Sequence, residues 1–120
     1  MKLSPLTAIS PIDGRYGSKT TELRPFVSEY GLIHHRVIVE IEWLKALASH
    51  PEITEVPAFS EDAITYLNSI MADFNEADAQ HVKDIESKIN HDVKAIEYFI
   101  KEKLEKLDEL NAICSFRLHL

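Results

Sequence analysis

The sequence predicts an all-α fold, with an extended N-terminal arm followed by about five helices. Three observations carry this prediction. Apolar residues recur at steps of three and four from residue 21 onward. Residues that favour helix starts precede these segments, and two of the three glycines lie within residues 1–20. We therefore divide the chain into an arm with a glycine-rich turn (1–20), a helical domain (21–113) and a divergent end (114–120).

The arm is the irregular part of the chain. Residues 1–20 show no sustained apolar period, and a turn is expected at Asp13-Gly14 because both residue types favour turns. Ser18 or Thr20 is expected to open the first helix, since a hydroxyl there can accept a hydrogen bond from a free backbone N–H.

The first helical region spans residues 21–48. Its apolar positions fall on one helix face: Ile33, Val37, Ile41, Leu44 and Ala48. Pro25 marks either a first helical turn or a seam between a short and a longer helix. His50-Pro51 ends the region, and residues 51–59 are expected to form a loop.

Three further helices follow, each behind a capping residue. Ser60 precedes two acids that suit a first helical turn, Asn75 can cap the next helix, and Asn90 can cap the last. The last helix has the clearest apolar stripe of the chain, formed by Val93, Ile96, Ile100, Leu104 and Leu107.

Composition excludes several classes of function. The 120 residues carry 20 acidic and 13 basic side chains, a formal net charge of −7, so a nucleic-acid partner is not expected. Cys114 is the only cysteine and no histidine lies four residues from another, so neither a disulfide framework nor a zinc site is expected. No apolar stretch is long enough for a membrane span or a signal peptide, and a cytoplasmic protein is the default.

The segment Asp13–Ser18 is the first candidate site. Gly14 and Gly17 would let a ligand approach the backbone closely, Arg15 offers a planar fork for phosphate or carboxylate, and Tyr16 adds a hydroxyl donor. The alternative is an ordinary turn that happens to contain an arginine.

The segment Asn90-His91-Asp92 is the second candidate. His91 is flanked by an amide and a carboxylate at a junction of helices, where an imidazole can donate to an oxyanion or assist proton transfer. The alternative is that Asn90 and Asp92 serve as capping residues and His91 is a bystander.

Both candidate segments resemble a known family. Ser10–Tyr16 (Ser-Pro-Ile-Asp-Gly-Arg-Tyr) is similar to the N-terminal motif of the adenylosuccinate lyases, and Asn90–Phe99 is similar to a second block of that family. Ser28–Leu32, Glu42–Leu44 and Glu55–Phe59 fit its bacterial branch. Two motifs that agree in order and spacing are far more specific than one.

The resemblance implies a mostly helical enzyme of the fumarase/aspartase superfamily, built as a homotetramer. Such enzymes cleave adenylosuccinate, or the succinyl-carboxamide ribotide of purine synthesis, by β-elimination of fumarate. It implies that Arg15 and Tyr16 hold the purine nucleotide at its phosphate end, and that Asn90, His91 and Asp92 contact the substrate, with His91 in an assisting role near the reacting atoms. No metal or organic cofactor is implied.

The resemblance also implies that parts of the machinery lie beyond residue 120. The family's general acid is a histidine and its general base a serine in a mobile loop, and both follow this segment. Residues 114–120 depart from the family pattern, so we expect an N-terminal fragment that is inactive alone. We also expect the stripe of the last helix to lack its usual partners and to favour self-association. The alternative function is a stand-alone helical interaction module without catalysis.

Overall fold

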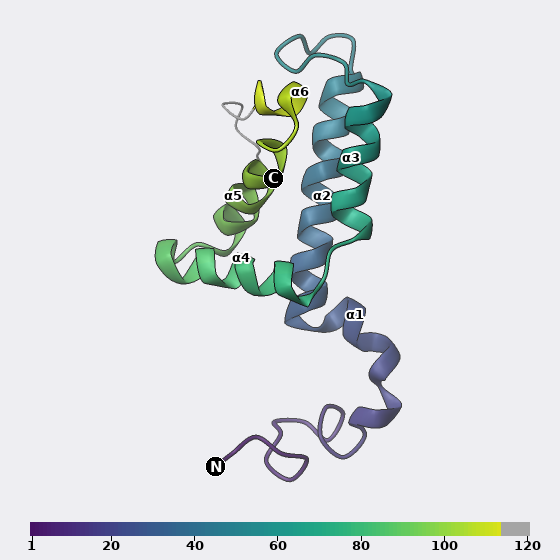
Figure 1. Cartoon of the computed structure of the whole chain (residues 1–120). Helices are drawn as coiled ribbons and strands as arrows, with labels where there is room; N and C mark the ends of the chain where they lie inside the picture. Colours follow the sequence, from purple (N-terminus) through teal and green to yellow (C-terminus); the bar gives the residue numbers. More distant parts are fainter. Residues whose placement is uncertain (114–120) are drawn as a thin grey trace. The chain divides into compact units, whose positions relative to one another are not determined.

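A computed structural model of the chain describes residues 1–113. The described residues contain helices and turns but no strand, which confirms the all-α prediction. They divide into two compact units, Met1–Leu32 and a second that begins at Ile33 (Figure 1). The boundary that we placed after residue 20 therefore falls inside the first unit, and the end predicted to diverge, 114–120, lies outside the described residues.

The first unit begins with a run of turns. The backbone N–H of Ala8 donates to the carbonyl of Ser4 at 2.8 Å, and that of Tyr16 donates to Pro11 at 2.8 Å. Gly14 is required here, because a Cβ at this position would lie 2.7 Å from the carbonyl oxygen of Pro5.

Two short 3₁₀ helices follow, Gly17–Lys19 and Thr21–Leu23. The predicted opening of a helix by a hydroxyl cap is wrong at both positions. Ser18 lies inside the first of these helices, and Thr20 precedes the second without capping it. The Thr20 hydroxyl instead donates to the carbonyl of Ile12 at 3.1 Å.

A sharp bend joins the first two α-helices, α1 (Arg24–Val27) and α2 (Glu29–Ser49). Pro25 lies in the first turn of α1, and the seam itself falls at Ser28, whose backbone is extended. The Ser28 hydroxyl accepts a hydrogen bond from the N–H of Gly31 at 3.1 Å. A Cβ at Gly31 would lie 2.6 Å from the backbone of Phe26, so the bend needs glycine there.

The second unit contains the long part of α2 and four more helices, α3 (Glu61–Ala72), α4 (Glu76–Ile89), α5 (Asp92–Leu104) and α6 (Asp108–Asn111). Figure 1 shows α3 returning beside α2, and α4 leading across to α5. Two of the predicted caps are confirmed. The Ser60 hydroxyl accepts from the N–H of Ala63, and Asn75 forms a capping box with Asp78.

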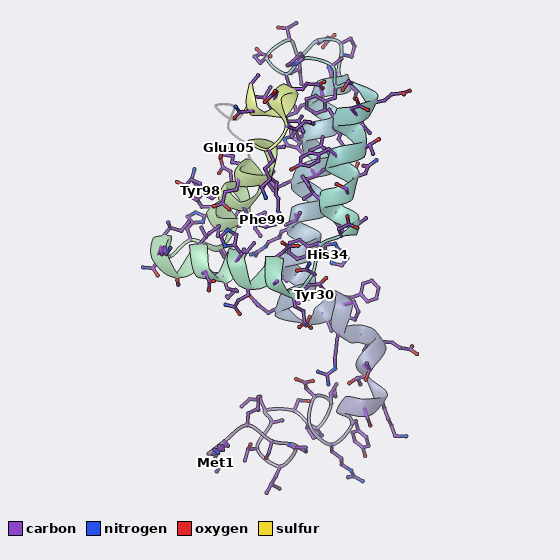
Figure 2. The ribbon with its side chains drawn as sticks, in the orientation of Figure 1. Met1, Tyr30, His34, Tyr98, Phe99 and Glu105 are labelled. Atoms are coloured by element: carbon purple, nitrogen blue, oxygen red, sulfur yellow. The ribbon has the colours of Figure 1, made fainter. Side chains whose placement is uncertain are left out.

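The core of this unit is built from the apolar faces of its helices. Its largest fully buried side chains are Val37, Ile41, Leu44, Val56, Leu67, Val82, Ile96, Phe99, Ile100, Leu104 and Leu110. The ring of Phe74 meets that of Phe99 edge to face at 5.7 Å, and the Tyr66 hydroxyl donates to the carbonyl of Lys103 at 2.6 Å. Figure 2 shows Phe99 turned inward from α5 and Tyr98 on its outer side.

The expected exposure of the stripe is wrong for its three central residues; Val93 is half-buried, and so is Leu107, which lies beyond the end of α5. Ile96, Ile100 and Leu104 are at most 1% exposed, because the other helices of the same chain cover them. The exposed apolar side chains of the helical unit lie elsewhere, and Val39 and Trp43 on α2 are about half exposed. None of the helices in the described part of the chain is long and apolar enough to cross a membrane.

Candidate functional site

The second candidate segment forms the corner between α4 and α5. Asn90 ends α4: its N–H donates to the carbonyl of Glu86 at 2.7 Å, and its backbone is left-handed, with φ 54° and ψ 38°. It is the one residue with positive φ among those described. Asparagine tolerates this conformation better than most residues with a Cβ, and the reversal lets α5 begin two residues later.

His91, rather than Asn90, caps α5. Its Nδ1 accepts a hydrogen bond from the backbone N–H of Lys94 at 3.1 Å. The predicted capping of this helix by Asn90 is therefore wrong, because Asn90 already closes the preceding helix. A neutral imidazole that accepts at Nδ1 carries its proton on Nε2. No described residue accepts a hydrogen bond from this Nε2–H, so His91 keeps one donor for a ligand.

Asp92 is the first residue of α5 and is held on two sides. Its Oδ1 accepts from the backbone N–H of Val93 at 2.8 Å, and its Oδ2 pairs with Arg36 Nη1 at 3.0 Å. The backbone hydrogen bond from Val93, followed by the contacts of Arg36, lowers the pKa of the Asp92 carboxyl. Asp92 is therefore an anion at neutral pH, able to accept hydrogen bonds but not to donate a proton.

The three residues line one hollow. Asn90, His91 and Asp92, together with Glu86, surround an open polar depression of about 420 Å³. The structure thus brings together all three predicted residues of this segment. They offer an imidazole N–H and an amide beside a fixed carboxylate, a set that can orient a polar ligand through both donors and acceptors.

Arg15 and Tyr16 lie in the first unit, on the turn before Gly17–Lys19, and both are exposed. The Arg15 guanidinium lies over the Tyr16 ring, 4.9 Å from its centroid. Arg15 forms no ion pair with any described residue, so its planar fork keeps its donors for an anion. The two candidate segments belong to different units.

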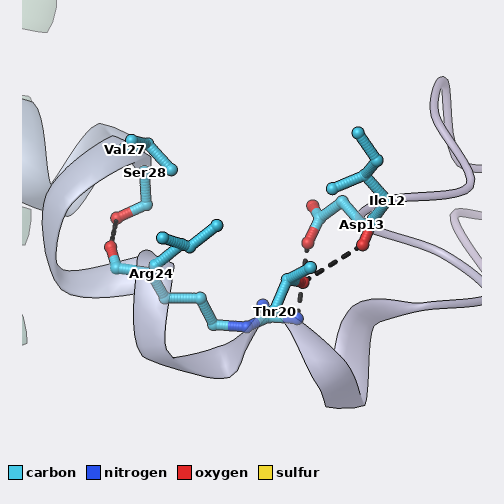
Figure 3. Close-up of a pocket in the computed structure, with 7 residues that line it drawn as sticks. Ile12, Asp13, Thr20, Arg24, Val27 and Ser28 are labelled. Carbon is cyan, nitrogen blue, oxygen red and sulfur yellow. Dashed lines mark hydrogen bonds and ion pairs between the residues drawn. The ribbon is translucent and has the colours of Figure 1, made fainter.

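The first unit also contains a hollow that the sequence did not indicate. It measures about 260 Å³ and is lined by Ile12, Asp13, Thr20, Leu23, Arg24, Val27 and Ser28 (Figure 3). Arg24 Nη2 pairs with Asp13 Oδ1 at 3.3 Å and donates to the carbonyl of Gly17 at 3.4 Å. These contacts join residues eleven and seven positions apart that belong to different parts of the chain, and no sequence period could have indicated them. Because Arg24 is already engaged, we assign it to holding the turns together.

The structure offers little to a metal ion. Within residues 1–113, no group of three or more histidine, cysteine, aspartate or glutamate side chains is arranged to hold one.

Comparison with known proteins gives one consistent result. A family model described as Lyase matches residues 14–116. The chain is 59% identical over 116 residues to the adenylosuccinate lyase of Vibrio cholerae, 57% identical to that of Escherichia coli K12 and 44% identical to that of Legionella pneumophila strain Corby. Each match covers 97% of this chain and 25% of the relative, so the chain spans about a quarter of the length of these curated relatives.

Proposed function

Because the chain belongs to the lyase family, as the match over residues 14–116 shows, we propose that it works as part of an adenylosuccinate lyase. The reaction is the cleavage of adenylosuccinate to AMP and fumarate, and of the succinyl-carboxamide ribotide to its carboxamide and fumarate. A base removes a proton next to a carboxylate, an acid protonates the leaving nitrogen, and fixed donors hold the charge that develops. In our proposal this chain supplies substrate-holding groups, and other segments supply the acid and the base.

The observation that supports this role is the hollow at the α4–α5 corner. His91 Nε2–H and the Asn90 amide are donors that no described side chain occupies, and both residues line the hollow. Donors fixed by helix ends need no rearrangement when a substrate oxygen gains charge. We therefore assign His91 an assisting role near the reacting atoms and Asn90 and Asp92 to substrate orientation.

Arg15 and Tyr16 are assigned to the phosphate end of the nucleotide. The exposed guanidinium has no carboxylate partner among the described residues, and a planar fork binds phosphate through two parallel hydrogen bonds. The Tyr16 ring beneath it restricts its movement, since the two groups attract each other.

The remaining parts of the proposal concern the complete enzyme. We propose that it assembles as a homotetramer, acts in the cytoplasm and needs no metal or organic cofactor. The chain has a net charge of −7, so the substrate phosphate must be attracted by a local positive group and not by the field of the whole segment.

The test is a chimaera with the Escherichia coli relative. The matched quarter of that enzyme is replaced by this chain's sequence, and fumarate release from adenylosuccinate is followed by ultraviolet absorbance. At 57% identity over the exchanged segment, we expect a folded chimaera that cleaves adenylosuccinate. The unmodified relative is the control. A folded chimaera with no cleavage would contradict the proposal and would favour the interaction module instead.

A further inference from the structure

One carboxyl group is buried inside the apolar face of α2. Glu40 lies one turn from Val37 and one turn from Leu44, both fully buried, and is itself only 2% exposed. Its Oε2 atom has no hydrogen-bond partner. An ionised carboxylate in such a place is strongly disfavoured, because the lost hydration is not replaced.

A second buried carboxyl group lies on α5. Glu97 is 6% exposed and has two ammonium partners, Lys94 Nζ at 3.3 Å from Oε2 and Lys101 Nζ at 3.5 Å from Oε1. Its Oε1 atom has no hydrogen bond. In the described part of the chain, this atom and Glu40 Oε2 are the two buried side-chain oxygens without a hydrogen bond.

Glu97 affects the titration of Glu40. Burial raises the pKa of Glu40, and the negative charge of Glu97 raises it further. Seven other charged or polar side chains on the helices of this unit have partners of their own: Arg36 (Asp92), Lys45 (Glu42), His34 (Met71 carbonyl), Tyr66 (Lys103 carbonyl), Lys103 (Asp78), His81 (Glu102) and Lys83 (Glu86).

We propose that Glu40 and Glu97, two buried carboxyl groups that each have an oxygen without a hydrogen bond, retain one proton between them to higher pH than exposed glutamates do, and so make the packing of α2 and α5 sensitive to pH. We assign the proton to Glu40, because Glu97 has two ammonium partners and Glu40 has none among the described residues. Loss of that proton places a second negative charge in the core. The same two helices are joined by the ion pair of Arg36 and Asp92, which lies where α5 begins. The inference is independent of the proposed function.

The sign of the pH dependence follows from the raised pKa of Glu40. In the unfolded chain a glutamate loses its proton near its ordinary value of 4.5, whereas the folded chain retains it to higher pH. Folding therefore takes up a proton in this window, and stability falls as pH rises from 4.5 through the raised pKa. One retained proton lowers the folding equilibrium constant about tenfold for each pH unit inside the window.

The test compares Glu40→Gln with the original chain. Urea unfolding is followed by the helical circular-dichroism signal between pH 4 and 8, with Glu105→Gln, an exposed site directly after the end of α5, as the matched control. We expect the Glu40→Gln chain to gain relative stability as pH rises, because an amide cannot ionise. The control should keep the pH dependence of the original chain. Equal pH dependence of Glu40→Gln and the original chain would overturn the proposal.

A second measurement does not depend on whether the Glu40→Gln chain folds. Carbon-13 NMR of glutamate carboxyl groups in the original chain should show one resonance that titrates above the ordinary range. In Glu97→Gln that titration should move to lower pH, because the neighbouring negative charge is gone and the lysines remain. Titration of every glutamate near 4.5 would contradict the proposal. An unchanged titration midpoint of this resonance in Glu97→Gln would show that burial alone raises the pKa of Glu40. That result would also contradict the proposal that the two carboxyl groups retain one proton between them.

Discussion

At the corner between α4 and α5, three consecutive residues have three different tasks. Asn90 reverses the chain, His91 caps α5 with one ring nitrogen, and Asp92 is fixed by the Val93 N–H and by Arg36. The sequence predicted that these residues belong together, because they are consecutive polar residues at the junction of two predicted helices. Their tasks could not be predicted, since asparagine suits both a helix end and a helix start.

The backbone of Asn90 leads to a stability prediction. At φ 54°, Asn90→Ala places a Cβ in a left-handed conformation and should lower the free energy of unfolding by about 1 kcal/mol. Asn90→Gly has no Cβ to strain and should change stability less. Urea unfolding of the two variants measures this difference. Equal losses for alanine and glycine would show that the side-chain amide, and not the backbone conformation, is what the fold requires.

At the scale of helices, two of the expected caps were predicted correctly, whereas the packing of the helices was not predicted. Ser60 and Asn75 cap the helices that they precede, since a cap involves only neighbouring backbone groups. The stripe on α5 was recognised as apolar, but its partners in the chain could not be read from its period. Glu40 was missed although the signal was present: it lies among Ile33, Val37, Ile41 and Leu44, on the same face.

The capping box of α4 gives a prediction at this scale. The Asn75 side chain accepts from the Asp78 N–H at 2.9 Å, and Asp78 accepts from the Asn75 N–H at 3.2 Å. Asn75→Ala should therefore reduce the free energy of unfolding by about 1 kcal/mol, and Asn75→Ser should retain most of it. Thermal unfolding of both variants is the measurement. An alanine variant as stable as the original chain would show that packing alone holds the start of α4.

At the scale of the molecule, the helical unit buries the apolar faces of its own helices, whereas the N-terminal unit is rich in exposed apolar side chains. Leu3, Leu6, Ile9, Phe26 and Val27 are each more than 60% exposed. The stripe on α5 gives no basis for the expected self-association, since the chain covers it. The predicted family is confirmed by the Lyase match and by a relative that is 59% identical. The family could be predicted because it depends on the order and spacing of motifs, which the sequence shows directly, and not on individual side-chain contacts.

A polypeptide of these 120 residues should not release fumarate from adenylosuccinate. The proposal assigns the general acid and base to other segments, and each such group typically contributes about 10²–10⁴ to the rate. The assay is ultraviolet absorbance on protein purified from a host without its own lyase. Cleavage at enzyme-like rates would show that this segment contains the proton-transfer groups after all.

The central claim, that Arg15 anchors the phosphate and His91 works near the reacting atoms, is tested most directly by steady-state kinetics of the active chimaera. Arg15→Ala should raise KM strongly, and Arg15→Lys should restore it only in part, because a point charge cannot replace a bidentate fork. His91→Gln should lower kcat more than it raises KM, because its contact strengthens mainly in the transition state. Melting curves of the same variants control for stability. Near-normal kinetics in both the Arg15→Ala and His91→Gln chimaeras would contradict the assignment of the site.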